Sequence, residues 1–236
     1  MRGLRFSRWS AVVFMTLSVA GFGTLSSPAG DANAPIPSVR TAFSNPPGLG
    51  PGIFLVASPE LQSPHFGETV VLLVEHDKTG ALGLVVNRVS KFTLNEAMPD
   101  LNWLEAPARP LFVGGPVQPE LITVLFRSQS ALPGSEFVVA DIHISASEEM
   151  LRSLLARKAA AFVVYAGYAG WGPGQLEAEL QHGSWRLAEA ESGLVFDRAI
   201  DDIWPELIRQ TEAVWTRTTQ DPTPHTATLP KTKQET

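Results

Sequence analysis

Residues 69–87 read TVVLLVEHDKTGALGLVVN, and this stretch decides the fold. Its first half is a continuous run of β-branched and apolar residues, which is typical of a buried strand. The segment from Asp77 to Gly80 then has the composition of a tight turn, and a second apolar run returns from Leu82 to Val86. Two apolar runs on either side of such a turn predict a β-hairpin.

Further apolar runs of strand length lie on both sides of the hairpin. They cover residues 53–57, 111–113, 121–126, 137–140 with a continuation to 144, 161–165, 184–189 and 193–196. The strands come in groups and do not alternate strictly with helices. This grouping predicts an α+β fold and argues against a doubly wound parallel sheet. We expect a single domain over residues 52–216, because no repeat or break interrupts that range.

Helices are predicted where polar start signals precede apolar residues at helical spacing. Capping-box patterns occur at Thr93–Glu96 and at Ser145–Glu148. A short helix is predicted over residues 175–180. A final helix is predicted to begin at Asp201 with Pro205 in its first turn, where the missing N–H costs little.

The two ends of the chain differ in composition from the middle. Residues 1–34 combine three early arginines with an uncharged apolar run from Ala11 to Leu25, the pattern of a secretory signal peptide. An uncleaved N-terminal anchor is the alternative, although the run is shorter than the ~20 residues that span a bilayer. A start codon placed too early is a third reading. Residues 35–51 are predicted to be a Pro/Gly-rich linker, and residues 217–236 a disordered tail.

Charge and cysteine content exclude several kinds of function. The 236 residues carry a formal net charge of −6, and residues 48–216 hold 11 basic against 21 acidic side chains, a net charge of −10. Such a domain repels phosphate-rich partners, so nucleic-acid binding is not expected. The chain has no cysteine, which excludes disulfides, thiolate metal sites and a cysteine nucleophile.

Three long motifs in fixed order resemble those of the YqgE/AlgH family. The first comprises FLVASPEL at residues 54–61, PHF at 64–66, TVV at 69–71, EHD at 75–77 and GALGLVVNR at 80–88. The second is FVGGPV at 112–117, and the third is GYAGWGPGQLEAEL at 167–180 followed by Trp185 and VFD at 195–197. The resemblance spans about residues 52–210.

The resemblance implies an α+β domain with a bent, mixed, barrel-like sheet and helices packed outside it. Members are labelled transcriptional regulators, and one is linked by name to alginate production. The family brings no catalytic residue set that could be carried over. This chain departs from typical members in its N-terminal segment, and an exported copy could not regulate transcription by touching DNA.

The glycine-rich segment at residues 167–174 is the first candidate site. It is predicted to be a surface loop that opens a helix at Gln175, with free N–H groups that could receive an anion or a partner. A tight strand-to-helix turn packed on the sheet is the favoured interpretation, and the binding site is the alternative. No lysine follows the last glycine, so this is not a phosphate-binding P-loop. The candidate binding residues are Tyr168, Gly170, Trp171, Gly172 and Gly174, together with Asn87 and Arg88 at a strand end.

The ionisable residues of the sequence do not indicate a catalytic site or a metal site. Glu75, His76 and Asp77 do not converge in a strand, because alternate side chains point to opposite faces. A Ser58–His76–Asp77 triad can be assembled on paper, but Ser58 lacks the flanking glycines of a nucleophile elbow. Asn87 and Arg88 could bind an anion or simply anchor the strand, and Arg88 is expected to pair with a carboxylate. No metal and no cofactor are expected.

The sequence therefore favours a non-catalytic binding or interaction domain that acts outside the cytoplasm, periplasmic or exported, with an unknown protein or small molecule as its partner. A membrane contact would involve only the N-terminal segment, if it is uncleaved. The alternatives are a cytoplasmic transcriptional regulator and a ligand-processing enzyme that uses the glycine-rich segment.

Overall fold

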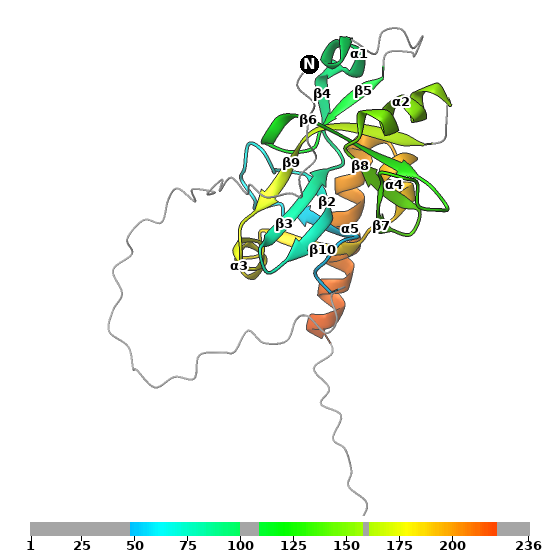
Figure 1. Ribbon diagram of the computed structural model, residues 1–236. Helices are drawn as coiled ribbons and strands as arrows, with labels where there is room; N and C mark the ends of the chain where they lie inside the picture. Colours follow the sequence, from blue (N-terminus) through cyan, green and yellow to red (C-terminus); the bar gives the residue numbers. More distant parts are fainter. Residues whose placement is uncertain (1–47, 100–108, 158–160, 221–236) are drawn as a thin grey trace, which may run out of the picture.

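The computed structural model of the chain describes residues 48–99, 109–157 and 161–220, with side chains of the last helix described up to Glu212. The strands are β1 (Ile53–Ala57), β2 (Val70–Asp77), β3 (Gly80–Val85), β4 (Val89–Thr93), β5 (Pro110–Val113), β6 (Val117–Arg127), β7 (Glu136–Val139), β8 (Ile142–Ser145), β9 (Phe162–Trp171) and β10 (Trp185–Glu189). The helices are α1 (Leu94–Ala97), α2 (Glu148–Ala156), α3 (Gln175–Gln181), α4 (Ser192–Phe196) and α5 (Ile200–Gln220) (Figure 1).

The strands form one mixed sheet in the order β10-β1-β2-β3-β9-β6-β8-β7. All neighbours in this order are antiparallel. β5 joins β9 in parallel, and β4 pairs with β5 outside the main path. The predicted hairpin is confirmed as β2 and β3, with Lys78 and Thr79 between them.

The sheet curls into a half-barrel, so that its last strand returns toward its first ones. Val139 of β7 lies beside Gly52, where a Cβ built on the glycine would be 2.7 Å from the valine Cβ. Val138 shares an apolar cluster with Phe54 and Val70. Figure 1 shows the curled sheet with α5 running behind it. The α+β fold with a bent mixed sheet and outer helices is therefore confirmed.

Three apolar clusters hold the fold together. The first fills the inside of the curl and includes Ile203 and Leu207 of α5, so the last helix closes the open side of the half-barrel. The indole N–H of Trp204 adds a 2.8 Å hydrogen bond to the Ala57 carbonyl. The second cluster lies on the outer face of β1, β2 and β3 beneath α3. The third lies beneath α2 on β6 and β9.

A helix begins near each of the two predicted capping boxes. The first begins at the expected residue, and the second has a different N-cap. The Thr93–Glu96 capping box is confirmed at α1, with Glu96 accepting from the Thr93 N–H at 2.7 Å. At α2 the N-cap is Ser147, whose hydroxyl accepts from the Met150 N–H. Ser145, the expected cap, is buried and donates to the Gly134 carbonyl at 2.6 Å. None of the described helices has the length and hydropathy needed to cross a membrane.

Several local predictions were wrong. The run at 193–196 forms helix α4, because a four-residue apolar run has too little periodicity to separate helix from strand. The run at 137–144 is split into β7 and β8 by a turn at Ala140, which has φ 51°. Pro205 is the sixth residue of α5, beyond its first turn, because the helix begins at Ile200.

The glycine-rich segment is also different from the prediction, because β9 continues through Trp171. The strand is possible because glycines let neighbouring backbones approach it closely. Gly114 accepts from the Val85 N–H and donates to the Ala166 carbonyl, which joins β3 to β9. Gly167, at φ 71°, lies so close to the Gly115 carbonyl that an added Cβ would be 2.6 Å from its oxygen. The second and third sequence motifs therefore pack directly on each other.

Two hydroxyls inside the half-barrel lead to a prediction about stability. Tyr165 and Thr123 face each other across β9 and β6, both are buried, and neither hydroxyl has a partner in the structure. Burial raises the pKa of the Tyr165 phenol far above its ordinary value. A buried polar group without a hydrogen bond costs about 1–3 kcal/mol. We therefore expect Tyr165→Phe to leave the free energy of unfolding unchanged or to raise it by about 1 kcal/mol in urea titrations, and a clear loss would contradict this account.

Candidate functional site

Trp171 lies at the end of β9 and is only 2% exposed. Its indole N–H donates to Glu179 Oε2 at 2.9 Å, and the Trp185 N–H donates to the same oxygen at 2.8 Å. Gln175 donates to the other oxygen of Glu179 at 2.9 Å. One carboxylate of α3 thus fixes two tryptophans and the first turn of its own helix.

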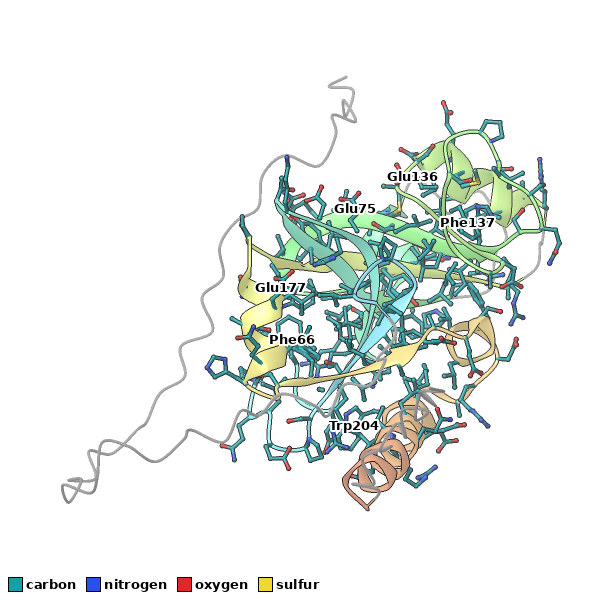
Figure 2. The ribbon with its side chains drawn as sticks, turned by 90° about the horizontal axis from the view of Figure 1, so that it is seen from below. Phe66, Glu75, Glu136, Phe137, Glu177 and Trp204 are labelled. Atoms are coloured by element: carbon teal, nitrogen blue, oxygen red, sulfur yellow. The ribbon has the colours of Figure 1, made fainter. Side chains whose placement is uncertain are left out.

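Phe66 completes this aromatic cluster. Its ring centroid lies 6.2 Å from that of Trp171 and 5.7 Å from that of Trp185. Figure 2 shows Phe66 beside α3, the helix that also carries Glu177. The three rings are at most 7% exposed, so the cluster belongs to the core and presents no open cage.

Asn87 and Arg88 hold the segment that carries Phe66. The Asn87 side chain accepts from the Val70 N–H at 2.8 Å and donates to the Glu68 carbonyl at 2.9 Å. Arg88 donates to the carbonyls of His65 and Gly67. The expectation that Arg88 pairs with a carboxylate is wrong, because the chain folds its carbonyls around the guanidinium. The structure thus links Asn87 and Arg88 to Trp171 through one loop.

Tyr168 points to the other side of β9 from Trp171. It is 6% exposed and belongs to the cluster inside the half-barrel, whereas Trp171 packs in the cluster beneath α3. A period of two along a strand produces this separation. The two rings therefore share no surface, although both belong to the same glycine-rich segment.

The three candidate glycines have separate positions. A Cβ on Gly170 would lie 3.2 Å from the Tyr168 ring. The buried Gly172 donates its N–H to the Gln175 side chain at 3.1 Å. Gly174 is the N-cap of α3 in the left-handed region, with open space around it. Their role in binding a ligand stays a prediction.

Ser58, His76 and Asp77 do not form a catalytic triad in the structure. His76 is bonded to Glu177 of α3 at 2.8 Å, and this hydrogen bond lowers the pKa of Glu177. Asp77 instead accepts from Thr79 within its own turn. Ser58 follows β1 near the start of β2, so about 20 Å of strand separates it from His76. Among the described residues, no group of three or more His, Asp or Glu side chains could hold a metal ion.

Glu75 is a half-buried carboxyl group on β2. Figure 2 shows it beside Glu136. Burial, followed by repulsion from Glu136 and Asp77, raises the pKa of Glu75 above its ordinary value. A carboxyl whose pKa is raised by folding destabilises the native state once it ionises, so stability is lost as the pH rises from about 4.5.

We therefore expect Glu75→Gln to raise the midpoint of thermal unfolding by a few degrees at pH 7 and to have little effect at pH 3.5. Glu136→Gln should give part of the same gain, because it removes the repulsion but not the burial. Melts of both variants from pH 3.5 to 8 measure this. A loss of stability in Glu75→Gln at pH 7 would show that the ionised carboxylate is favourable here.

A cleft of about 210 Å³ lies where β5 and β9 begin, beside the junction of α4 and α5. Apolar side chains form most of its wall, including Val86, Phe112, Phe162, Val195, Phe196 and Ile203. Two arginines, Arg109 and Arg198, also line it. This combination of an apolar wall and a few polar groups is typical of small-molecule sites, although the volume is below their usual ~300 Å³.

The two arginines of the cleft differ in their partners. Arg198 donates to both carboxylate oxygens of Glu206, at 2.8 and 2.6 Å. The guanidinium carbon of Arg109 lies 4.2 Å from the Phe162 ring centroid, and its Nε is buried without a hydrogen bond. Within residues 48–99, 109–157 and 161–220, no carboxylate forms an ion pair with Arg109.

Residues 54–215 of the sequence match the family described as AlgH-like, which is more than two thirds of the chain. The chain belongs to the AlgH-like family. The resemblance that the three motifs suggested is therefore confirmed.

AlgH-like relatives match this chain over most of their own length. A UPF0301 protein of Anaeromyxobacter dehalogenans is 39% identical over 176 residues, covering 70% of this chain and 89% of the relative. One from Magnetococcus marinus is 37% identical over 162 residues, with 67% and 87% covered. These names give a family and state no activity.

Two solved structures share the AlgH-like fold. The solution structure of AlgH from Pseudomonas aeruginosa has a TM-score of 0.59 and 30% identity, covering 73% of this chain and 94% of that one. A crystal structure of a Corynebacterium diphtheriae protein also has a TM-score of 0.59, at 22% identity, with 72% and 91% covered. The latter supports the fold alone.

Sequence reasoning missed the cleft and the His76–Glu177 pair. Arg109 directly precedes β5, but no motif indicates that its guanidinium lies over a ring from β9. His76 and Glu177 are 101 residues apart. By contrast, the alternation of Tyr168, Ala169, Gly170 and Trp171 is a strand signal that could have been recognised.

Proposed function

We propose that this AlgH-like protein is a non-catalytic binding domain that acts outside the cytoplasm, and that its ligand occupies the cleft between β5, β9, α4 and α5. The observation that carries the proposal is the Arg109 guanidinium at an apolar cleft without a carboxylate partner among the described residues. Arg109 is half-buried and stacks on Phe162, and a cation held against an apolar wall without a counter-charge favours a site for an anionic ligand.

The arrangement of the other polar groups supports a non-catalytic role. Glu179 is occupied by two indole N–H groups and Gln175, and Arg88 by backbone carbonyls. Glu177 and His76 bond to each other, and Asp77 bonds to Thr79. Each of these hydrogen bonds joins parts of the fold.

Action outside the cytoplasm is supported by the composition of residues 1–34. N-terminal sequencing of the protein purified from separated cell compartments tests it. We expect a periplasmic or membrane-associated protein, which begins near residues 28–35 if the segment is cleaved and at Met1 if it remains as an anchor. Recovery only from the cytoplasm, beginning at Met1, would overturn the location.

The alternative of a DNA-binding regulator makes an opposite prediction. Because residues 48–216 carry a net charge of −10, we expect no specific binding to duplex DNA near physiological salt. Fluorescence anisotropy with genomic fragments measures this. Sequence-dependent nanomolar binding would revive the regulator.

The cleft is tested with 1-aminoanthracene, an uncharged fluorescent probe. We expect one binding site per chain, lost in Ile200→Trp, because Ile200 is half-buried at the cleft and tryptophan would fill it. Leu180→Trp is the matched control, since Leu180 is half-buried on α3 and does not line the cleft. Equal binding by both variants, or no binding by the unmodified protein, would contradict the proposal.

A further inference from the structure

We propose that the ligand of the cleft is a small carboxylate with an apolar tail, whose carboxylate is held by Arg109 and whose tail lies between Phe162, Phe196 and Ile203. This inference rests on the proposed function and adds the chemical class of the ligand. It follows from the charge of Arg109, from the size of the cleft and from its apolar wall.

The charge argument begins with Arg109. Its guanidinium lies 4.2 Å from the Phe162 ring centroid, so one face of the planar group is covered by an aromatic ring. Its Nε–H is buried and has no acceptor. A carboxylate accepts two parallel hydrogen bonds from a guanidinium. The terminal nitrogens of Arg109 are not among the buried atoms, so a carboxylate in the cleft could accept from them and neutralise the charge.

Arg198 directs the carboxylate to Arg109. Arg198 Nη2 contacts both oxygens of Glu206, and Glu206 is itself only partly exposed. A second carboxylate at Arg198 would approach Glu206 and be repelled by it. The two arginines thus differ: Arg198 is paired with a carboxylate of α5, whereas Arg109 has no carboxylate partner among the described residues.

The cleft also limits the size and character of the ligand. A volume of about 210 Å³ has room for a carboxylic acid with a short alkyl or single-ring tail, and the rest of a longer chain would stay in solvent. The wall consists mostly of Phe, Val and Ile side chains, which exclude a strongly polar tail. Each methylene that enters an apolar wall should strengthen binding about fourfold.

The experiment is isothermal titration of the full chain with the even-numbered alkanoates from butanoate to dodecanoate, and with octanamide as the uncharged counterpart of octanoate. We expect affinity to rise by about fourfold per methylene up to six to eight carbons and then to level off. Octanoate should bind at least tenfold more tightly than octanamide, as for hydrogen bonds between charged groups.

Arg109→Met should abolish the preference for octanoate over octanamide, and Arg109→Lys should restore part of it. Arg186→Met is the matched control and should retain the preference, because Arg186 does not line the cleft. Thermal melts establish that each variant is folded, and binding of 1-aminoanthracene establishes that the cleft is intact.

The outcomes separate the two proposals. Equal affinity for octanoate and octanamide, with 1-aminoanthracene still bound at one site, would overturn the carboxylate and leave the binding cleft standing. Binding of neither the alkanoates nor 1-aminoanthracene would overturn both. Retention of the preference in Arg109→Met would also overturn the role given to Arg109.

Discussion

Gly115→Ala is expected to destabilise the protein by more than about 3 kcal/mol, which is a large part of the 5–15 kcal/mol that holds a typical domain together. A Cβ on Gly115 would lie 2.1 Å from the carbonyl carbon of Tyr168 and 2.2 Å from its oxygen. Those atoms are backbone of the central strand β9, so no side-chain rotation can relieve the contact. Urea unfolding of the purified variant, or its failure to accumulate as soluble protein, measures the effect.

Gly134→Ala is the matched control for this substitution. Gly134 has φ 79°, which alanine adopts only with strain, but a Cβ there meets nothing within 4 Å. We expect a loss of about 1 kcal/mol, due to backbone strain alone. If both variants lost the same free energy, the close approach of the two glycine motifs would not be what requires Gly115.

Trp171→Ala is expected to lower the free energy of unfolding by about 3–5 kcal/mol, as truncations of large buried aromatic residues do. The ring is 2% exposed, and it contacts Phe66 and Trp185. The substitution also removes one of the donors to Glu179. Denaturant titration measures the loss, and a pull-down with the folded variant tests whether a partner is lost.

Two milder variants separate packing from hydrogen bonding. Trp171→Phe keeps most of the ring and removes the N–H, so a loss of about 1–2 kcal/mol is expected. Trp204→Ala removes a half-buried tryptophan outside the aromatic cluster. A fully stable Trp171→Ala protein that no longer retains a partner would show that the ring serves binding and not the core.

The fold could be predicted from the sequence because its signals are local. The β2–β3 hairpin, the Thr93 capping box and strand β10 each depend on residues that are close in sequence. The bent shape of the sheet was predicted from the resemblance to the family. α4 was mistaken for a strand because its adjacent Leu194 and Val195 are both buried, which is compatible with either structure.

The candidate site was less predictable, because it depends on contacts between distant segments. Arg88 could be recognised as important, yet its partners are carbonyls of residues 65 and 67, which carry no side-chain signal. The cleft requires β5, β9, α4 and α5 to meet, and its residues extend from Val86 to Ile203. The solvent exposure of residues 167–171 also differs from the prediction. Their glycines suggested a surface loop, but they let β9 pack closely against neighbouring backbone.

The pairing of β1 with β10 has a consequence for the time at which the protein can fold. These strands join residues that are 128 to 136 positions apart. At a synthesis rate of ~5–20 residues per second, the ribosome needs on the order of ten seconds between them. Until then β1 lacks one neighbour, and the inside of the half-barrel lacks α5. The chain therefore stays open until its synthesis is almost complete, and its apolar strands are exposed to other binding partners during that interval.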